Sequence, residues 1–201
     1  SALPNAPHLQ VHNSYVVTQD DQGLLIVDQH ALHERVMFEQ LAARVLNDQQ
    51  SLESQRLLMP VVLDADPARL AALESLTALL ARIGVEAEPI GPTAIAVHAF
   101  PSFLFTRSVE PAEFLPDLLD RAAAGDLDPT TDTALEHALH DVLDMMACKA
   151  AVKAGDRLTP QEIDALLEKR DTVERSSNCP HGRPTTLRLS LTDLAKQFGR
   201  T

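Results

Sequence analysis

Hydrophobic and polar residues near the start of the chain follow a pattern typical of a β-hairpin that leads into a helix. From Tyr15, two β-rich runs flank a polar turn that ends at Gly23. The second run ends at Asp28 and passes directly into ALHERVMFEQLAARVL, whose apolar residues recur at helical spacing. The pattern therefore predicts Asp28 at a strand end and His30 at the start of a helix.

The middle of the chain predicts a mixed block of strands and helices. The run QRLLMPVVL predicts an extended segment, and Asp66 followed by Pro67 predicts the start of a helix that Gly84 ends. We further expect two short strands within residues 85–100, a helix over residues 111–124, and a long helix from Asp132 or Thr133 to Gly155.

The last part of the chain predicts a helix, a loop and a strand. Thr159 to Glu162 places a hydroxyl, a proline and a glutamate where a helix N-terminus favours them, and this helix is expected to last to about Arg170. SSNCPHGRP predicts a loop, LRLSL a short strand, and residues 192–198 a last helical turn. Strands at both ends around a strand and helix block predict an α+β fold, with a discontinuous domain (residues 1–62 and 147–201) and an inserted lobe (residues 63–146).

The composition indicates a soluble protein. A hydrophobic fraction of 45% in 201 residues is enough to bury a core. Apolar runs stay well below the roughly 20 residues that span a bilayer, and the start SALPNAPHLQ lacks the basic and apolar regions of a signal peptide. We therefore expect a cytoplasmic protein with no membrane partner.

The net charge of −12 argues against strong binding of nucleic acid by this chain alone. It results from 29 acidic and 17 basic residues, and no stretch concentrates Lys and Arg. Because affinity for nucleic acid comes largely from neutralising phosphates, tight independent binding to DNA is not expected.

Two strings at opposite ends of the chain carry candidate metal ligands. In DQHALHE, His30 and Glu34 lie one helical turn apart, and Asp28 directly precedes the helix. In CPHGRP, Cys179 and His181 are separated by one residue. Such a set suits zinc through sulfur and nitrogen, or manganese and magnesium through oxygen. The alternative left open by spacing alone is a helix-capping Asp28, a solvated His30 and a core Cys179.

Two neighbours of these ligands have less defined positions. Glu39 lies five residues beyond Glu34, about 140° round an ideal helix, so it is not expected in the same ligand cluster. His33, one turn from His30, has two alternatives, reaching the site or facing solvent.

Four motifs in the same order resemble the MutL endonuclease family of DNA mismatch repair. They are DQHALHERVMFE, Ala147-Cys148-Lys149, CPHGRP and Phe198-Gly199-Arg200. The resemblance implies a discontinuous dimerisation and endonuclease subdomain with an inserted regulatory lobe. It also implies a metal site lined by Asp28, His30, Glu34, Cys148, Cys179 and His181.

Within that set, the resemblance implies separate roles. Asp28, His30 and Glu34 would be catalytic, with Mn²⁺ or Mg²⁺ held by Asp28 and Glu34. Zn²⁺ would have a regulatory or structural role. The supporting residues would be Glu39, Lys149, Arg183 and Arg200.

The resemblance also implies partners. It covers only the C-terminal region of the family, so ATP would bind to an N-terminal domain that has no counterpart here. The implied activity is nicking of one strand of duplex DNA by a homodimer, weak in the isolated domain, with the mismatch-recognition protein MutS acting through the full-length protein. On apolar content, we expect the dimer contact at the terminal strands and Leu187 to Phe198.

The string QRLLMP resembles peptides that dock in the groove of the bacterial sliding clamp. Gln55 would be the polar anchor, and Leu57, Leu58 and Met59 would make the apolar contacts. Pro60 also belongs to the predicted clamp-binding set. The alternative is an ordinary strand whose leucines face a core.

Two other functions remain open at this stage. One is a non-catalytic module for dimerisation and clamp docking, with a structural zinc. The other is an unrelated zinc hydrolase, which would leave QRLLMP and the terminal FGR without explanation.

Overall fold

The chain forms two compact units, each containing strands and helices. The computed structural model describes residues 7–127, 129, 131–152, 155–172 and 183–200. Unit 1 comprises Ser1–Glu39 and Ala151–Thr201, and unit 2 comprises Gln40–Ala150. The predicted α+β class is confirmed, whereas the boundaries after residues 62 and 146 stay a prediction.

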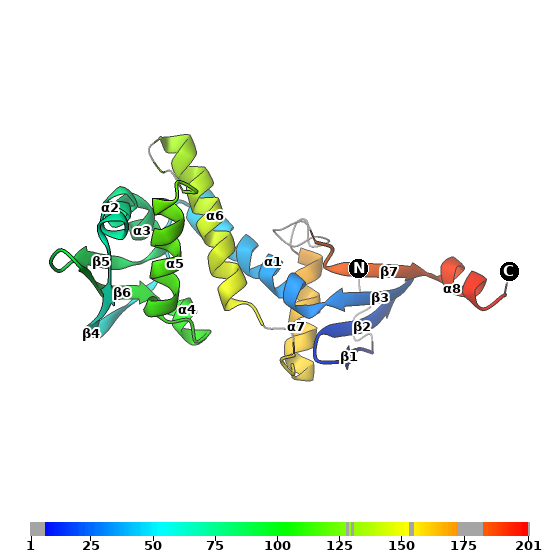
Figure 1. Cartoon of the computed structure of the whole chain (residues 1–201). Coiled ribbons are helices and arrows are strands. Elements are labelled where there is room, and N and C mark those ends of the chain that lie inside the picture. The colour runs from blue at the N-terminus through cyan, green and yellow to red at the C-terminus, as the bar shows by residue number, and fades with distance from the viewer. Residues whose placement is uncertain (1–6, 128, 130, 153–154, 173–182, 201) are drawn as a thin grey trace. The chain divides into compact units, whose positions relative to one another are not determined.

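Unit 1 is built on an antiparallel sheet with the strand order β1-β2-β3-β7 (Figure 1). The strands are β1 (Leu9–Val11), β2 (Tyr15–Asp20), β3 (Gly23–Asp28) and β7 (Thr186–Ser190). The predicted hairpin is β2–β3, and β7 pairs with β3, so strands from both ends of the chain share one sheet, as the sequence predicted. Strand β1 was not predicted.

Two helices cover one face of this sheet. They are α1 (Gln29–Ala42), which begins in unit 1, and α7 (Pro160–Thr172). The buried core contains Val16, Val27, Leu32, Val36, Ile163, Leu166 and Leu167. The predicted capping box of α7 is confirmed, because Thr159 N donates to Glu162 Oε2 (2.7 Å) and Glu162 N donates to Thr159 Oγ1 (3.3 Å).

A buried amide fixes the first turn of α1. Gln29 is fully buried, and its Nε2 donates to Asn13 O (2.7 Å) and Asp156 O (3.0 Å). Its Oε1 accepts from Gln10 Nε2 (2.7 Å). One side chain thus ties the β1–β2 turn and the segment before α7 to the helix start.

Unit 2 contains a second antiparallel sheet, with the order β4-β6-β5. Its strands are β4 (Ser54–Asp64), β5 (Glu86–Pro89) and β6 (Ala94–Pro101). Its helical segments are η1 (Ala43–Asn47), α2 (Pro67–Ser75), α3 (Thr77–Ile83), α4 (Ser102–Thr106), α5 (Pro111–Ala123) and α6 (Asp132–Ala150).

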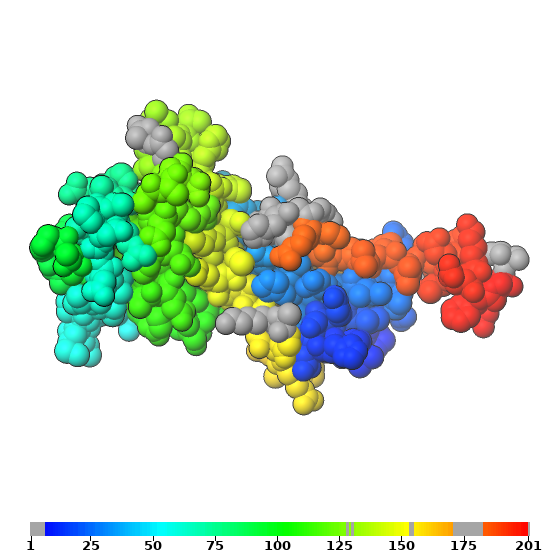
Figure 2. Space-filling model, in the orientation of Figure 1, coloured from blue at the N-terminus to red at the C-terminus, as the bar shows by residue number. Residues whose placement is uncertain are grey.

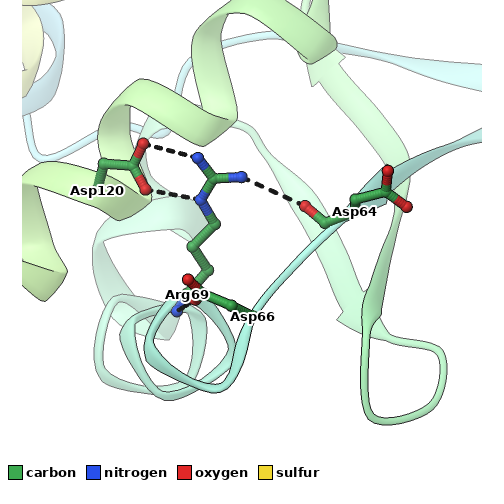
Figure 3. A network of polar contacts seen from close by, with 4 residues as sticks. All are labelled: Asp64, Asp66, Arg69 and Asp120. Carbon is green, nitrogen blue, oxygen red and sulfur yellow. Dashed lines mark hydrogen bonds and ion pairs between the residues drawn. The ribbon is translucent and has the colours of Figure 1, made fainter.

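The predicted cap at Asp66 is part of a polar network in unit 2 (Figure 3). Asp66 Oδ1 accepts from Arg69 N (2.8 Å) at the start of α2. The Arg69 guanidinium donates to both carboxylate oxygens of Asp120 on α5 (2.6 and 2.7 Å) and to Asp64 O (3.4 Å). This hydrogen bonding lowers the pKa of the Asp120 carboxyl, and the network joins α2 to α5 and to the end of β4.

Helix α6 begins at Asp132, as expected, whereas two other helix limits differ from the expectation. The helix that begins at Pro67 breaks at Leu76 and resumes as α3. Helix α6 is capped by Thr131, whose Oγ1 accepts from Ala134 N (3.1 Å). It ends at Ala150 and not at Gly155, since both backbone polar groups of Val152 bond to side chains of α1. None of the helices in the described part of the chain is long and apolar enough to cross a membrane.

Candidate functional site

The junction between β3 and α1 positions the first acid of the DQHALHE string. Asp28 Oδ1 accepts from Ala31 N (3.0 Å), which caps the helix. Asp28 N donates to Thr185 O (2.8 Å), directly beyond the CPHGRP string. Asp28 therefore performs the capping role that the sequence left open, and it does so at the point where both ends of the chain meet.

Two imidazoles of α1 bind the backbone of the same residue, Val152. His30 Nδ1 lies 2.7 Å from Val152 O, and Val152 N donates to His33 Nδ1 (3.0 Å). His33 thus contacts the segment after α6 and does not simply face solvent. Spacing gave no signal for Val152, because it carries no polar side chain and acts through its backbone.

Glu34 is the most buried acid of the candidate site. Its side chain has no exposed area, and Arg183 Nη2 lies 3.8 Å from Glu34 Oε2. Burying a carboxylate is costly unless a positive charge or hydrogen bonds offset it. Arg183, the arginine of CPHGRP, provides such a charge, so the described part of that string meets DQHALHE within unit 1. Cys179 and His181 lie outside the described residues.

Glu39 has a partner on its own helix. Arg35 Nη2 lies 2.5 Å from Glu39 Oε1, one turn earlier on α1. The Arg35 guanidinium also lies over the ring of Phe38, 5.6 Å from its centre. Glu39 therefore takes part in an arginine-centred contact on α1.

The remaining predicted residues lie elsewhere. Cys148 is an exposed residue of α6 in unit 2. Lys149 Nζ pairs with Asp117 Oδ2 of α5 (2.6 Å), also in unit 2. In unit 1, Arg200 is exposed after α8 (Leu191–Gln197), and its backbone N donates to Ala195 O (2.9 Å).

The donors around the start of α1 have the chemistry that a divalent metal needs. Asp28 and Glu34 offer carboxylate oxygens, and His30 offers a ring nitrogen whose second nitrogen is held by a carbonyl, as is usual for ligating histidines. Within the described ranges, however, no three such side chains form a group able to hold an ion. The donor types fit a divalent metal, but Asp28, His30 and Glu34 are not grouped as a three-ligand site in the described part of the chain.

The QRLLMP string lies on β4, at the edge of the unit 2 sheet. Gln55 and Arg56 pair with β6, and regular pairing resumes only at Val61. Between these positions, Leu58 and Met59 are almost fully exposed, at 105% and 81%. The structure therefore presents an apolar bulge in place of a buried strand segment.

A second apolar surface covers one face of the unit 1 sheet. Residues directly opposite one another in antiparallel strands share a face. One row of such partners runs across all four strands, and a second joins β3 to β7. We call this the apolar face, formed by Leu9, Val17, Leu24, Ile26, Leu187 and Leu189.

Large aliphatic side chains on the apolar face are exposed to solvent. Leu9 and Leu187 are 65% and 59% exposed. Figure 2 shows the residues of β7, in orange, lying against the blue residues of the hairpin. Contiguous apolar surface of this kind is typical of an interaction site.

These features define a two-unit α+β protein with an acid and imidazole cluster at a strand–helix junction and an apolar sheet face. Residues 8–158 match the family model described as MutL C terminal dimerisation domain. The chain belongs to this family.

Curated relatives resemble almost the whole chain. The DNA mismatch repair protein MutL of Symbiobacterium thermophilum is 40% identical over 191 residues, covering 95% of this chain and 29% of that protein. MutL proteins of Rhodopseudomonas palustris (strain BisB5) and Brucella abortus are each 38% identical over 195 residues, covering 97% of this chain and 31% and 30% of those proteins. The chain therefore spans about a third or less of the length of these relatives.

Proposed function

We propose that this chain is the homodimerising part of a MutL-type mismatch repair protein and that unit 1 carries a metal-dependent activity that nicks DNA. The observation that carries the nicking proposal is the cluster at the start of α1. There Asp28, His30 and the fully buried Glu34 share one helix end, with Arg183 beside Glu34. The names of the relatives support the assignment to mismatch repair.

We propose a role for each of these residues. Asp28 and Glu34 would hold Mn²⁺ or Mg²⁺, and the Zn²⁺ ligands would be Cys179, His181, His30 and Glu34. A bound divalent ion supplies an activated water and offsets charge on the leaving oxygen. Arg183 is 64% exposed, so its guanidinium can contact a phosphate of the substrate while neutralising Glu34.

The acidic charge of this chain supports the proposal that DNA is bound mainly by other parts of the protein and by its partners. A net charge of −12 repels duplex DNA, so the substrate must be delivered by other parts of a longer protein and by its partners. We propose ATP binding outside this chain, MutS acting through the full-length protein, and recruitment by the sliding clamp.

For homodimerisation, the proposed occupant of the apolar face is a second copy of this chain. The family description as a dimerisation domain favours that occupant over an unrelated partner. Leu191 of α8 and Phe198, directly after that helix, are also exposed apolar residues that follow β7 in the sequence. This proposal agrees with the terminal strands and Leu187 to Phe198 expected from the sequence.

For clamp recruitment, the proposed contact is the bulge of β4. An exposed sheet edge with bare apolar side chains favours self-association unless a partner covers it. Leu58 and Met59 would enter an apolar groove, and Gln55, still held by pairing with Phe100, would anchor the start of the segment.

Nicking of supercoiled plasmid with Mn²⁺ tests the catalytic proposal. We expect Asp28→Asn and Glu34→Gln to reduce the nicking rate about 100-fold or more, since each removes a charged ligand of the reacting centre. Glu168→Gln, an exposed acid of α7, is the matched control and should nick like the wild type. Circular dichroism establishes that each variant is folded.

Equal nicking by wild type and both variants would refute the catalytic proposal. A wild type that dimerises and holds zinc but never nicks would favour the alternative, a non-catalytic module for dimerisation and clamp docking with a structural zinc. In that case the Glu34→Gln variant would lose its zinc, and unfolding would accompany this loss.

A further inference from the structure

The backbone of Val152 links two histidines of α1, one through each of the two peptide groups that flank its Cα. Its carbonyl oxygen lies 2.7 Å from His30 Nδ1, and its N–H donates to His33 Nδ1 at 3.0 Å. His30 and His33 are three residues apart, so their side chains lie on one side of the helix. Both bonds form within unit 1.

These two bonds determine which ring nitrogen carries the proton. A carbonyl oxygen only accepts hydrogen bonds, so His30 Nδ1 bears the hydrogen. A backbone N–H only donates, so His33 Nδ1 presents a lone pair. A neutral His30 therefore has its free lone pair on Nε2, which is the form that binds a metal through Nε2.

We propose that His33 is a positioning residue that sets the tautomer and the ring orientation of His30 through the backbone of Val152. The inference rests on the proposed metal site. His33 accepts from the Val152 N–H and so holds the backbone of this residue in the conformation that presents its carbonyl to His30. The carbonyl bond keeps the hydrogen on Nδ1 and leaves Nε2 available as a ligand.

The position of Val152 explains why this link is needed. Val152 follows the end of α6 and is half-buried, so its backbone is not held by the hydrogen-bond ladder of that helix. Removing His33 takes away the acceptor of the Val152 N–H, so the residue can turn about its φ and ψ angles and move its carbonyl away from His30. An imidazole without a partner at Nδ1 favours the hydrogen on Nε2 in water, and that tautomer cannot bind a metal through Nε2.

The test compares His33→Ala with His33→Gln. The glutamine oxygen can accept from Val152 N as His33 does, whereas alanine cannot. Long-range proton–nitrogen NMR spectra of histidine-labelled, metal-free protein report the tautomer, and a His30→Gln spectrum assigns the signal of His30. We expect the Nδ1–H form in wild type, the Nε2–H form as the major species in His33→Ala, and return of the Nδ1–H form in His33→Gln.

Zinc affinity is the second measurement, by competition with a chromophoric chelator. We expect binding about 10-fold to 100-fold weaker in His33→Ala, the usual effect of losing a group that orients a ligand, with recovery in His33→Gln. His137→Ala on α6, which also removes one histidine, is the control and should bind zinc like the wild type.

The two possible failures have different signatures. An unchanged Nδ1–H tautomer in His33→Ala would overturn the role of His33, whatever the zinc affinity. A wild type that binds no zinc would overturn the metal site itself, and with it the purpose of the link.

Discussion

At the scale of single residues, the caps were predictable and the long-range side-chain contacts were not. Asp66 and the Thr159–Glu162 box occupy the positions that their local sequence indicated. The link between His33 and Val152 joins residues far apart in sequence, so local spacing carries no signal for it. The same is true of the ion pair between Asp20 and Arg188.

Asp20 and Arg188 join the β2–β3 turn to β7. Asp20 Oδ1 accepts from Gln22 N (2.9 Å) and Gly23 N (3.1 Å), and the Arg188 guanidinium donates to both carboxylate oxygens (2.7 and 2.6 Å). The bond to Arg188 lowers the pKa of Asp20 from 3.8 to about 2.

Because this pKa is lowered on folding, the pair stabilises the folded state fully above about pH 4 and loses that contribution as the pH falls towards 2. We expect Arg188→Gln to return the pKa of Asp20 towards 3.8. Its free energy of unfolding should therefore be lower than that of the wild type at pH 5 to 7, and the difference should shrink towards pH 2. Urea unfolding at a series of pH values measures this.

The control for this prediction is Arg157→Gln, which removes an exposed arginine of unit 1. Its difference from the wild type should be small at every pH. A difference for Arg188→Gln that stays constant from pH 7 to pH 2 would contradict the proposed linkage.

At the scale of elements, long periodic segments were predicted and short ones were missed. The β2–β3 hairpin, α1, α5 and α7 are present where the pattern indicated them. Strand β1 and helix α4 are too short to establish a period. The bulge of β4 was also missed, since the apolar run around Leu58 reads as a continuous strand.

The pairing of β3 with β7 depends on a glycine at the strand start. Gly23 has φ of 151°, and a Cβ at this position would collide with the backbone oxygen of Leu189. We expect Gly23→Ala to separate β7 from β3 and to destabilise unit 1 by about 2 kcal/mol or more, because a backbone atom cannot move aside easily. Amide hydrogen exchange of residues 186–190 should lose protection.

Gly125→Ala isolates the effect of backbone strain. Gly125 also has positive φ, 84°, but a Cβ there would meet nothing within 4 Å. This variant should cost about 1 kcal/mol and leave the exchange of β7 unchanged. Equal protection of β7 in both variants would show that the close contact at Gly23 is unimportant.

At the scale of the whole molecule, the sequence predicted the meeting of the two chain ends but only part of the apolar face. The segment from Leu187 onward is apolar in its own sequence. The contribution of Leu9, Val17 and Ile26 becomes apparent only through the pairing register, which places them in one row with Leu187 across the sheet.

Two leucines in different units allow dimerisation and clamp binding to be separated. We expect Leu187→Asp to raise the dimer dissociation constant about 30-fold or more, since a charge would be buried within the proposed contact. Leu58→Asp should weaken binding to a bacterial sliding clamp by a similar factor. Sedimentation velocity and calorimetric titration with the clamp measure the two effects.

Each variant serves as the control for the other. Leu187→Asp should keep its affinity for the clamp, and Leu58→Asp should remain dimeric. Loss of both properties in either variant would indicate general unfolding, and a dimeric Leu187→Asp would exclude the apolar face as the contact between copies.

The two faces of the unit 1 sheet have different roles, and this would limit how the proposed dimer cuts DNA. One side packs on α1, and the apolar face is the other side. A two-fold pair joined through the apolar face therefore places two sheet layers, about 10 Å apart, between its two α1 helices. In the proposed dimer, the two sheet layers would separate the two proposed nicking sites, and we expect them not to act on directly opposed phosphates. We therefore expect such an assembly to interrupt one strand at a time and to leave the duplex in one piece.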